Sequence, residues 1–120
     1  MNAGDTFLVP DAIGTHLYCV LALLDDDSVV LCHFTTRRRF SDPTCIVYKG
    51  EHEFFVEPES AVRYDQVHNC SGEGLAALER MIMKRLAPLS AELLARVRKG
   101  ALDSPQTPDK MKEMLKPKPR

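Results

Sequence analysis

The chain has 120 residues, of which 44% are hydrophobic and 28% charged, a composition that fits one soluble domain with a hydrophobic core over residues 1–120. The best apolar run, residues 17–24, is much shorter than a membrane span and is followed by three aspartates. The first residues lack the basic and apolar regions of a signal peptide, so we expect a cytoplasmic protein without membrane association.

Charge is divided unevenly along the chain. Residues 1–72 carry 5 basic and 11 acidic side chains, a net charge of −6, whereas residues 73–120 carry 11 and 6, a net charge of +5. Opposite charges of this kind attract each other within one chain or between chains, and the basic part could also face an acidic partner. Charged helix faces in solvent would give the same pattern.

The positions of the four cysteines indicate free thiols and not disulfides. The four cysteines would suggest two disulfides in a secreted chain, but three of them lie inside apolar runs, and we expect buried free thiols. No C-x-x-C pair is present. We therefore predict no metal site and no cofactor.

Short β-prone segments separated by turn residues make up residues 1–70. We expect strands over residues 5–10, 16–24, 28–35, 45–48, 53–56 and 61–67. The second and third of these form a predicted hairpin with Asp25, Asp26 and Asp27 at its tip. Short strands at close spacing favour a small twisted sheet or barrel over a layer of alternating strands and helices.

The hydrophobic period changes at Ser71, where a helical addition over residues 71–115 is expected to begin. Apolar side chains at spacings of three and four would share one face of a first helix, and they are Leu75, Leu78, Ile82 and Leu86. Ser71 can cap this helix and Pro88 would end it.

Two further helices are expected after Pro88. Ser90 would cap the second, and Gly100 lies where a left-handed terminating residue belongs. The third would be capped by Thr107 and run to Leu115, leaving residues 116–120 as a frayed tail.

Arg37, Arg38 and Arg39 directly follow Thr35 and Thr36 at the end of a predicted strand. A guanidinium group matches the geometry of a phosphate, and a threonine hydroxyl can donate one more hydrogen bond. The cluster is therefore a candidate phosphodiester site. A solvated charge run is the alternative, because adjacent side chains on extended backbone cannot all face one ligand.

Histidines are the candidate proton-transfer groups, because imidazole titrates near neutral pH. The chain has four of them: His16, His33, His52 and His68. On a strand, His33 would face away from its neighbour Cys32. A structural role is the alternative for each of them.

Five segments, in this order and at this spacing, resemble the MazF/PemK-like family. They are GDTFLVP (residues 4–10), HLYCVL (16–21), VVLCHFTT (29–36), DPTCIVYKGEHEFF (42–55) and ESAVRYDQV (59–67). The resemblance covers about the first two thirds of the chain.

This resemblance implies an α+β fold, a small SH3-like β-barrel of about six short strands followed by two or three C-terminal helices. It implies an endoribonuclease of the toxin–antitoxin type that cleaves single-stranded RNA without a metal, through attack by the RNA's own 2′-hydroxyl. It also implies three partners: single-stranded RNA, an antitoxin-like protein and a second copy of the chain in a homodimer.

His16 is where the chain departs from the family, whose active members carry an arginine at the start of the second strand. We expect His16 to act there as general acid or base. The candidate catalytic residues are then His16, Thr35, Thr36 and Arg37, and the candidate RNA-binding residues are Arg38, Arg39 and Lys49. The alternative is a non-catalytic barrel that binds a protein or nucleic-acid partner through the same groove.

Overall fold

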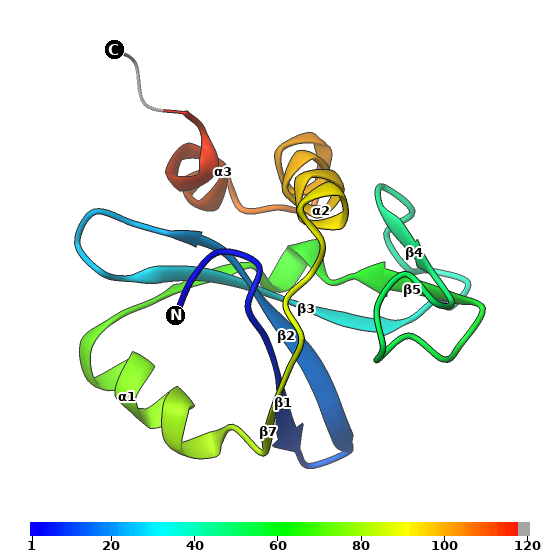
Figure 1. Ribbon diagram of the computed structural model, residues 1–120. Coiled ribbons are helices and arrows are strands. Elements are labelled where there is room, and N and C mark those ends of the chain that lie inside the picture. Colours follow the sequence, from blue (N-terminus) through cyan, green and yellow to red (C-terminus); the bar gives the residue numbers. More distant parts are fainter. Residues whose placement is uncertain (118–120) are drawn as a thin grey trace.

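A computed structural model describes residues 1–117 of the chain. The architecture is α+β, with one antiparallel sheet between helix α1 on one face and helices α2 and α3 on the other (Figure 1). The end of the predicted tail, residues 118–120, lies outside the described part.

Seven strands make up the sheet within this part of the chain. They are β1 (Thr6–Asp11), β2 (Gly14–Leu23), β3 (Val29–Thr36), β4 (Ile46–Tyr48), β5 (Glu59–Val62), β6 (His68–Cys70) and β7 (Lys84–Leu86). The helices are α1 (Gly72–Met81), α2 (Ala91–Asp103) and α3 (Asp109–Leu115), and a short 3-10 turn covers Tyr64–Gln66. None of the helices in residues 1–117 is long and apolar enough to cross a membrane.

The strands are ordered β4-β5-β3-β2-β1-β7, and β6 also pairs with β3. Strand β3 therefore has β2 along one side and two successive partners along the other. Its first residues, 29–31, pair with β6 and its last residues, 34–36, pair with β5. The sheet does not close between β4 and β7, so the closed barrel expected from the sequence is not confirmed.

The predicted β2–β3 hairpin is confirmed, with Tyr18 opposite His33 and Leu23 opposite Val29. The three aspartates lie at its tip, as expected. Asp27 has a φ of 64°, a left-handed conformation that aspartate tolerates better than most residues.

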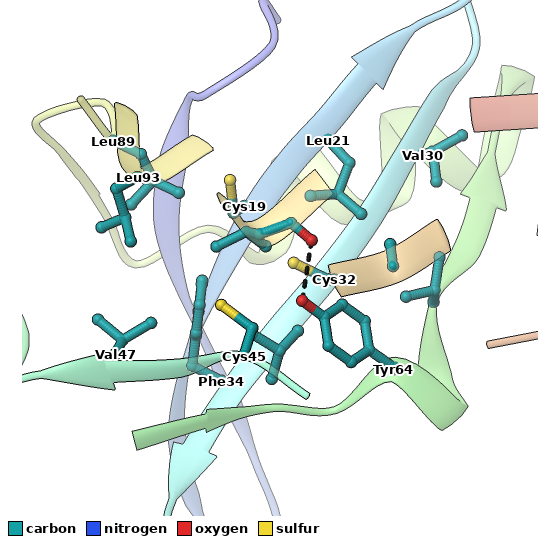
Figure 2. Packing of buried hydrophobic residues seen from close by; sticks show 14 of the residues in the cluster. Cys19, Leu21, Val30, Cys32, Phe34, Cys45, Val47, Tyr64, Leu89 and Leu93 are labelled. Carbon is teal, nitrogen blue, oxygen red and sulfur yellow. Dashed lines mark hydrogen bonds between the residues drawn. The ribbon is translucent and has the colours of Figure 1, made fainter. Parts of the chain in front are cut away.

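Alternation along β2 and β3 creates the larger of two hydrophobic clusters. Leu17, Cys19 and Leu21 on β2 point to the same face as Cys32 and Phe34 on β3. Figure 2 shows part of this cluster, with Leu89 and Leu93 at upper left, Tyr64 at lower right and Cys45 between them. Helices α2 and α3 cover it with Leu93, Val97, Ala101, Met111 and Leu115. Cys19, Cys32 and Cys45 are buried free thiols, as predicted.

The opposite face of the sheet carries the second cluster. It consists of Phe7, Val9, Val20, Val29 and Leu31. Leu75 and Leu78 of α1 pack against it together with Ile82, the residue that follows the helix, and these are three of the four residues of the predicted helical stripe.

The prediction of one helix from Ser71 to Pro88 is wrong in its second half. Helix α1 ends at Met81, and Lys84–Leu86 forms strand β7, which pairs with residues 6–8 of β1. The free edge of β1 supplies backbone hydrogen-bond partners that a longer helix would leave unused. Consequently α1 precedes the last strand, and the helices do not all follow the sheet. Ser71 is the N-cap residue, but its side chain makes no capping hydrogen bond.

Residues 53–56 do not form the expected strand. The Phe54 amide donates to His52 Nδ1 at 3.1 Å and the Phe55 amide to the His52 carbonyl at 3.0 Å, so the backbone closes into a turn. The strand expected over residues 61–67 is also shorter than predicted. It stops at Val62, and the 3-10 turn leads directly to β6.

The two C-terminal helices lie where the sequence predicted them, but not all of the predicted capping residues are confirmed. The Leu93 amide donates to Ser90 Oγ at 3.1 Å, which confirms that cap. Helix α2 passes through Gly100 and ends at Asp103. Helix α3 ends at Leu115 as predicted, but Pro108 occupies its N-cap, and the buried Thr107 hydroxyl has no hydrogen-bond partner in residues 1–117.

Candidate functional site

A groove of about 540 Å³ opens where β2 begins and β3 ends. The β2–β3 ladder stops at the pair Tyr18–His33, and beyond it the two strands form opposite walls. We call this the His16 groove. It is lined by Ile13, Gly14, Thr15, His16, Phe34, Thr35, Thr36, Arg38, Phe54, Phe55, Val56, Glu57 and Ser60.

Asp11 and His16 form an ion pair at the wall of this groove, with 2.6 Å between Asp11 Oδ2 and His16 Nε2. The other carboxylate oxygen, Oδ1, accepts from the amides of Ile13 at 2.8 Å and Gly14 at 2.9 Å. The Ile13 amide, followed by the charge of His16, lowers the pKa of Asp11. Asp11 therefore stays ionised and holds Nε2 of the ring, which leaves Nδ1 as the nitrogen able to exchange a proton with a ligand.

Tyr18 and His33 continue the row of rings that starts at His16. The ring centroids of His16 and His33 are 5.3 Å apart, and those of Tyr18 and His33 are 5.0 Å apart. His33 is 6% exposed. Burial, with the nearby His16 and Arg63, lowers the pKa of His33 to about 4. His33 is consequently neutral near pH 7 and acts there as a packing group beside His16.

Thr35 and Thr36 end β3, where they pair with Ala61 and Ser60 of β5. Both are half-buried. Successive strand residues face opposite sides of a sheet. Both threonines nevertheless line the His16 groove, because it opens at the strand end. The structure thus brings His16, Thr35, Thr36 and Arg38 to one groove.

The three arginines lie in the loop after β3, and their side chains separate. Arg37 Nη1 lies 3.1 Å from Glu59 Oε2 and is committed to that ion pair. Arg38 borders the His16 groove, and its guanidinium has no carboxylate partner in residues 1–117. Arg39 lies over the ring of Phe40, 5.3 Å from its centroid. Lys49 is exposed in the turn after β4 and lines no part of the groove.

A second hollow of about 500 Å³ adjoins the first. We call it the Phe40 hollow. Its lining residues are Thr35, Arg38, Arg39, Phe40, Ser41, Asp42, Ala61, Val62, Arg63, Asp65 and Gln106. Thr35 and Arg38 line both spaces, so the two hollows meet at these side chains.

The carboxylates of the Phe40 hollow are already satisfied. Arg63 Nε and Nη2 each donate to Asp65 at 2.9 Å. Asp42 accepts from Ser104 Oγ at 2.5 Å and from the Thr44 amide at 2.9 Å. Burial alone would raise the pKa of Asp42, but these hydrogen bonds hold it below its usual value.

The remaining histidines have local structural partners. His52 Nε2 lies 2.6 Å from the Ala87 carbonyl, and His68 Nδ1 lies 3.0 Å from the Gln66 carbonyl. Within residues 1–117, no three His, Cys, Asp or Glu side chains are grouped as a metal site would need.

The sequence did not indicate that Arg63 and Asp65 line the Phe40 hollow, or that Asp11 and His33 contact His16. Arg63 and Asp65 are two residues apart, but they belong to the 3-10 turn at Tyr64–Gln66, of which Arg63 is the N-cap, and not to the strand expected over residues 61–67. Nothing in the sequence indicated Asp11, since its contact with His16 depends on the tight β1–β2 turn.

No protein-family model matches this chain. A comparison with curated proteins also finds no match.

Proposed function

We propose that this protein is a PemK/MazF-like, metal-independent endoribonuclease that cleaves single-stranded RNA in the His16 groove. One observation carries the proposal. A histidine held by a carboxylate, His16 with Asp11 at 2.6 Å, shares a groove with two threonine hydroxyls and the guanidinium of Arg38.

RNA cleavage of this type needs a proton acceptor for the 2′-hydroxyl, a positive charge for the phosphate and a proton donor for the leaving 5′-oxygen. Nδ1 of His16 would accept the first proton, with Asp11 stabilising the imidazolium that results. The 2′-oxygen attacks phosphorus, the bond to the 5′-oxygen breaks, and a 2′,3′-cyclic phosphate forms. The imidazolium, or water, then returns a proton to the 5′-oxygen.

Arg38 is the arginine best suited to the phosphate. Its guanidinium is free of carboxylates in residues 1–117 and lies at the groove, whereas Arg37 is paired with Glu59. A guanidinium stabilises the charge that develops on the phosphate oxygens during attack. Thr35 and Thr36 would add hydrogen bonds to the same oxygens.

The SH3-like barrel and the homodimer belong to the same proposal. The short antiparallel strands, and the change of partner along β3 from β6 to β5, support the first. Exposed apolar side chains at the end of α1 and before β7, Met81 and Met83, support the second, because they offer a surface that a second copy could cover. Sedimentation at micromolar concentration tests the dimer, which Met83→Asp should weaken.

A second candidate is a module that binds an unstructured partner without cutting it. Two apolar residues at the groove, Ile13 and Val56, are 90% and 69% exposed, and such side chains are common at binding surfaces. In this case His16 would serve only as a hydrogen-bonding group.

Purified protein incubated with 5′-labelled single-stranded RNA in a chelator distinguishes the two. The first candidate predicts fragments ending in a 2′,3′-cyclic phosphate and no cleavage of the corresponding DNA, which lacks the 2′-hydroxyl. His16→Gln and Asp11→Asn should each lower the rate, the former by about 100-fold or more. Lys110→Gln, an exposed change on α3, is the matched control.

RNA that is bound and left intact by the wild-type protein would establish the binding module and overturn the endoribonuclease. Cleavage at full rate by His16→Gln would also overturn it, because another group would then move the proton.

A further inference from the structure

The Phe40 hollow has a distribution of charge that fits an anionic ligand. Asp65 is neutralised by Arg63, and Asp42 is held by Ser104 and Thr44. The guanidinium groups of Arg38 and Arg39 have no carboxylate partner in residues 1–117. The hollow therefore carries excess positive charge at the side where it meets the His16 groove.

Phe40 is an aromatic side chain held out in solvent. It is 88% exposed. The turn that carries it is closed at both ends, because the Arg38 amide donates to Ser41 Oγ at 2.8 Å and the Ser41 amide to the Arg38 carbonyl at 3.2 Å. Arg39 lies over the ring at 5.3 Å. An exposed ring on a closed turn gains nothing from burial, but it offers a flat surface on which another ring can stack.

We propose that the Phe40 hollow is a binding subsite for one unpaired nucleobase of a single-stranded RNA, stacked on Phe40, with the adjoining phosphate on Arg38. This rests on the proposed function and adds to it the place of the base beside the scissile phosphate. Single-stranded nucleic acids are bound by this combination of aromatic surfaces and cationic side chains.

A hydrogen-bonding side chain among the lining residues, the exposed Gln106, favours a base over a plain phosphate. The side-chain amide of Gln106 has no hydrogen bond to any other described residue, and an amide can both donate to and accept from a base edge. The apolar floor, Ala61 and Val62, suits the face of a ring. A lone phosphate would use neither of these features.

The volumes of the two hollows, and their junction at Thr35 and Arg38, fit a single strand of RNA that passes from one hollow to the other. Each space holds about 500 Å³, enough for a nucleoside but not for a duplex. Thr35 and Arg38 line both, so a phosphate at this junction would connect a base on Phe40 to a sugar beside His16. A nucleic acid bound in this way would therefore be single-stranded.

The chain contains no tryptophan, so Phe40→Trp places a single tryptophan, whose emission can be followed selectively, at the subsite. Titration with a short single-stranded 2′-O-methyl RNA, which cannot be cleaved by 2′-hydroxyl attack, should quench its emission through stacking. Tyr48→Trp, a half-exposed aromatic position outside both hollows, is the matched control and should keep its emission. Duplex RNA of the same sequence should leave both unchanged.

Fluorescence anisotropy with the same labelled RNA measures affinity. Phe40→Ala should weaken binding by about 10-fold or more, because stacking contributes on that scale. Phe40→Trp keeps an aromatic ring at this position and should bind about as well as the wild-type protein. Because Phe40 is exposed, Phe40→Ala is expected to fold normally, and Gln106→Ala provides a second, independent change in the lining of the hollow.

Unchanged emission of the Phe40→Trp variant, together with unchanged affinity of Phe40→Ala, would overturn the subsite even if the wild-type protein cleaves RNA. Quenching by inorganic phosphate or by duplex RNA to the same extent would overturn it as well. Quenching by the single strand with no cleavage of ordinary RNA would support the subsite and contradict the endoribonuclease, so the two proposals fail in different ways.

Discussion

The Tyr64 hydroxyl donates a hydrogen bond of 2.8 Å to the Val97 carbonyl of α2, and the ring of Tyr64 occupies the space beside Gly100. A Cβ atom at Gly100 would lie 2.1 Å from that hydroxyl and 2.9 Å from the ring carbon that bears it. Tyr64 is fully buried, and burial raises the pKa of its hydroxyl far above the ordinary value. This contact joins α2 to the chain segment that connects β5 and β6 (Figure 2).

Gly100→Ala should therefore destabilise the protein, although alanine is the better helix former. Helix propensity favours alanine by about 1 kcal/mol, whereas overpacking against a rigid buried ring costs about 2 kcal/mol or more. Urea denaturation measures the change in free energy of unfolding. In a Tyr64→Phe background the closest contact is gone, so the cost of Gly100→Ala should fall. An equal cost in both backgrounds would contradict this account.

His33 should make stability depend on pH in the acidic range. Its pKa falls from 6.5 to about 4 on folding, because burial disfavours the charged ring. The unfolded chain then binds more protons than the folded one, so stability falls as the pH drops from about 6.5 toward 4, by on the order of 3 kcal/mol in total. Urea midpoints at pH 7 and pH 5 measure this. His33→Phe, which keeps a ring beside Tyr18, should show a smaller difference, and an unchanged difference would assign the effect to other groups.

Arg37 and Arg38 are adjacent but should differ in their effect on RNA binding. Arg38→Gln should weaken binding of single-stranded RNA and reduce the slope of log K against log salt by about 0.7, the value for one phosphate contact on a single strand. Arg37→Gln is the matched control, because Arg37 is occupied by Glu59 on the surface. Equal losses in the two variants would indicate a general charge effect in place of a specific contact.

The cysteines should react in two classes with a thiol reagent. Cys19, Cys32 and Cys45 are buried, whereas Cys70 at the end of β6 is only half-buried. A hydrogen bond with Cys19, together with burial, raises the pKa of Cys32, and burial raises that of Cys45. At pH 8 the folded protein should expose one slowly reacting thiol, lost in Cys70→Ser, and the other three should react only after unfolding. Rapid reaction of all four in the native protein would contradict the described core.

Strands β1, β2 and β3 could be predicted from the sequence because they are short β-prone apolar runs bounded by turn residues. The hairpin of β2 and β3 and the cap of α2 at Ser90 also followed from local signals. These features depend on interactions between residues close in the chain, which composition and period report directly.

Strand β7 could not be predicted, because Leu86 continues the helical period of α1 and the chain turns to pair with β1 instead. The same limit applies to Gly100, which suggested a helix end. Its small size is needed where Tyr64, far earlier in the chain, packs against α2. In both cases a partner distant in sequence decides the local structure, and propensity alone cannot include it.

The candidate site divides in the same way. The sequence by itself determined which residue types are available. They are a histidine at the start of one apolar strand, and two threonines and three arginines at the end of the following strand. It also predicted that three adjacent arginines could not all face one ligand. Only the tertiary structure decided which of them meet, because the separation of β2 from β3 opens the groove. The β1–β2 turn sets Asp11 against His16, and Glu59 engages Arg37 but leaves Arg38 at the junction of the two hollows.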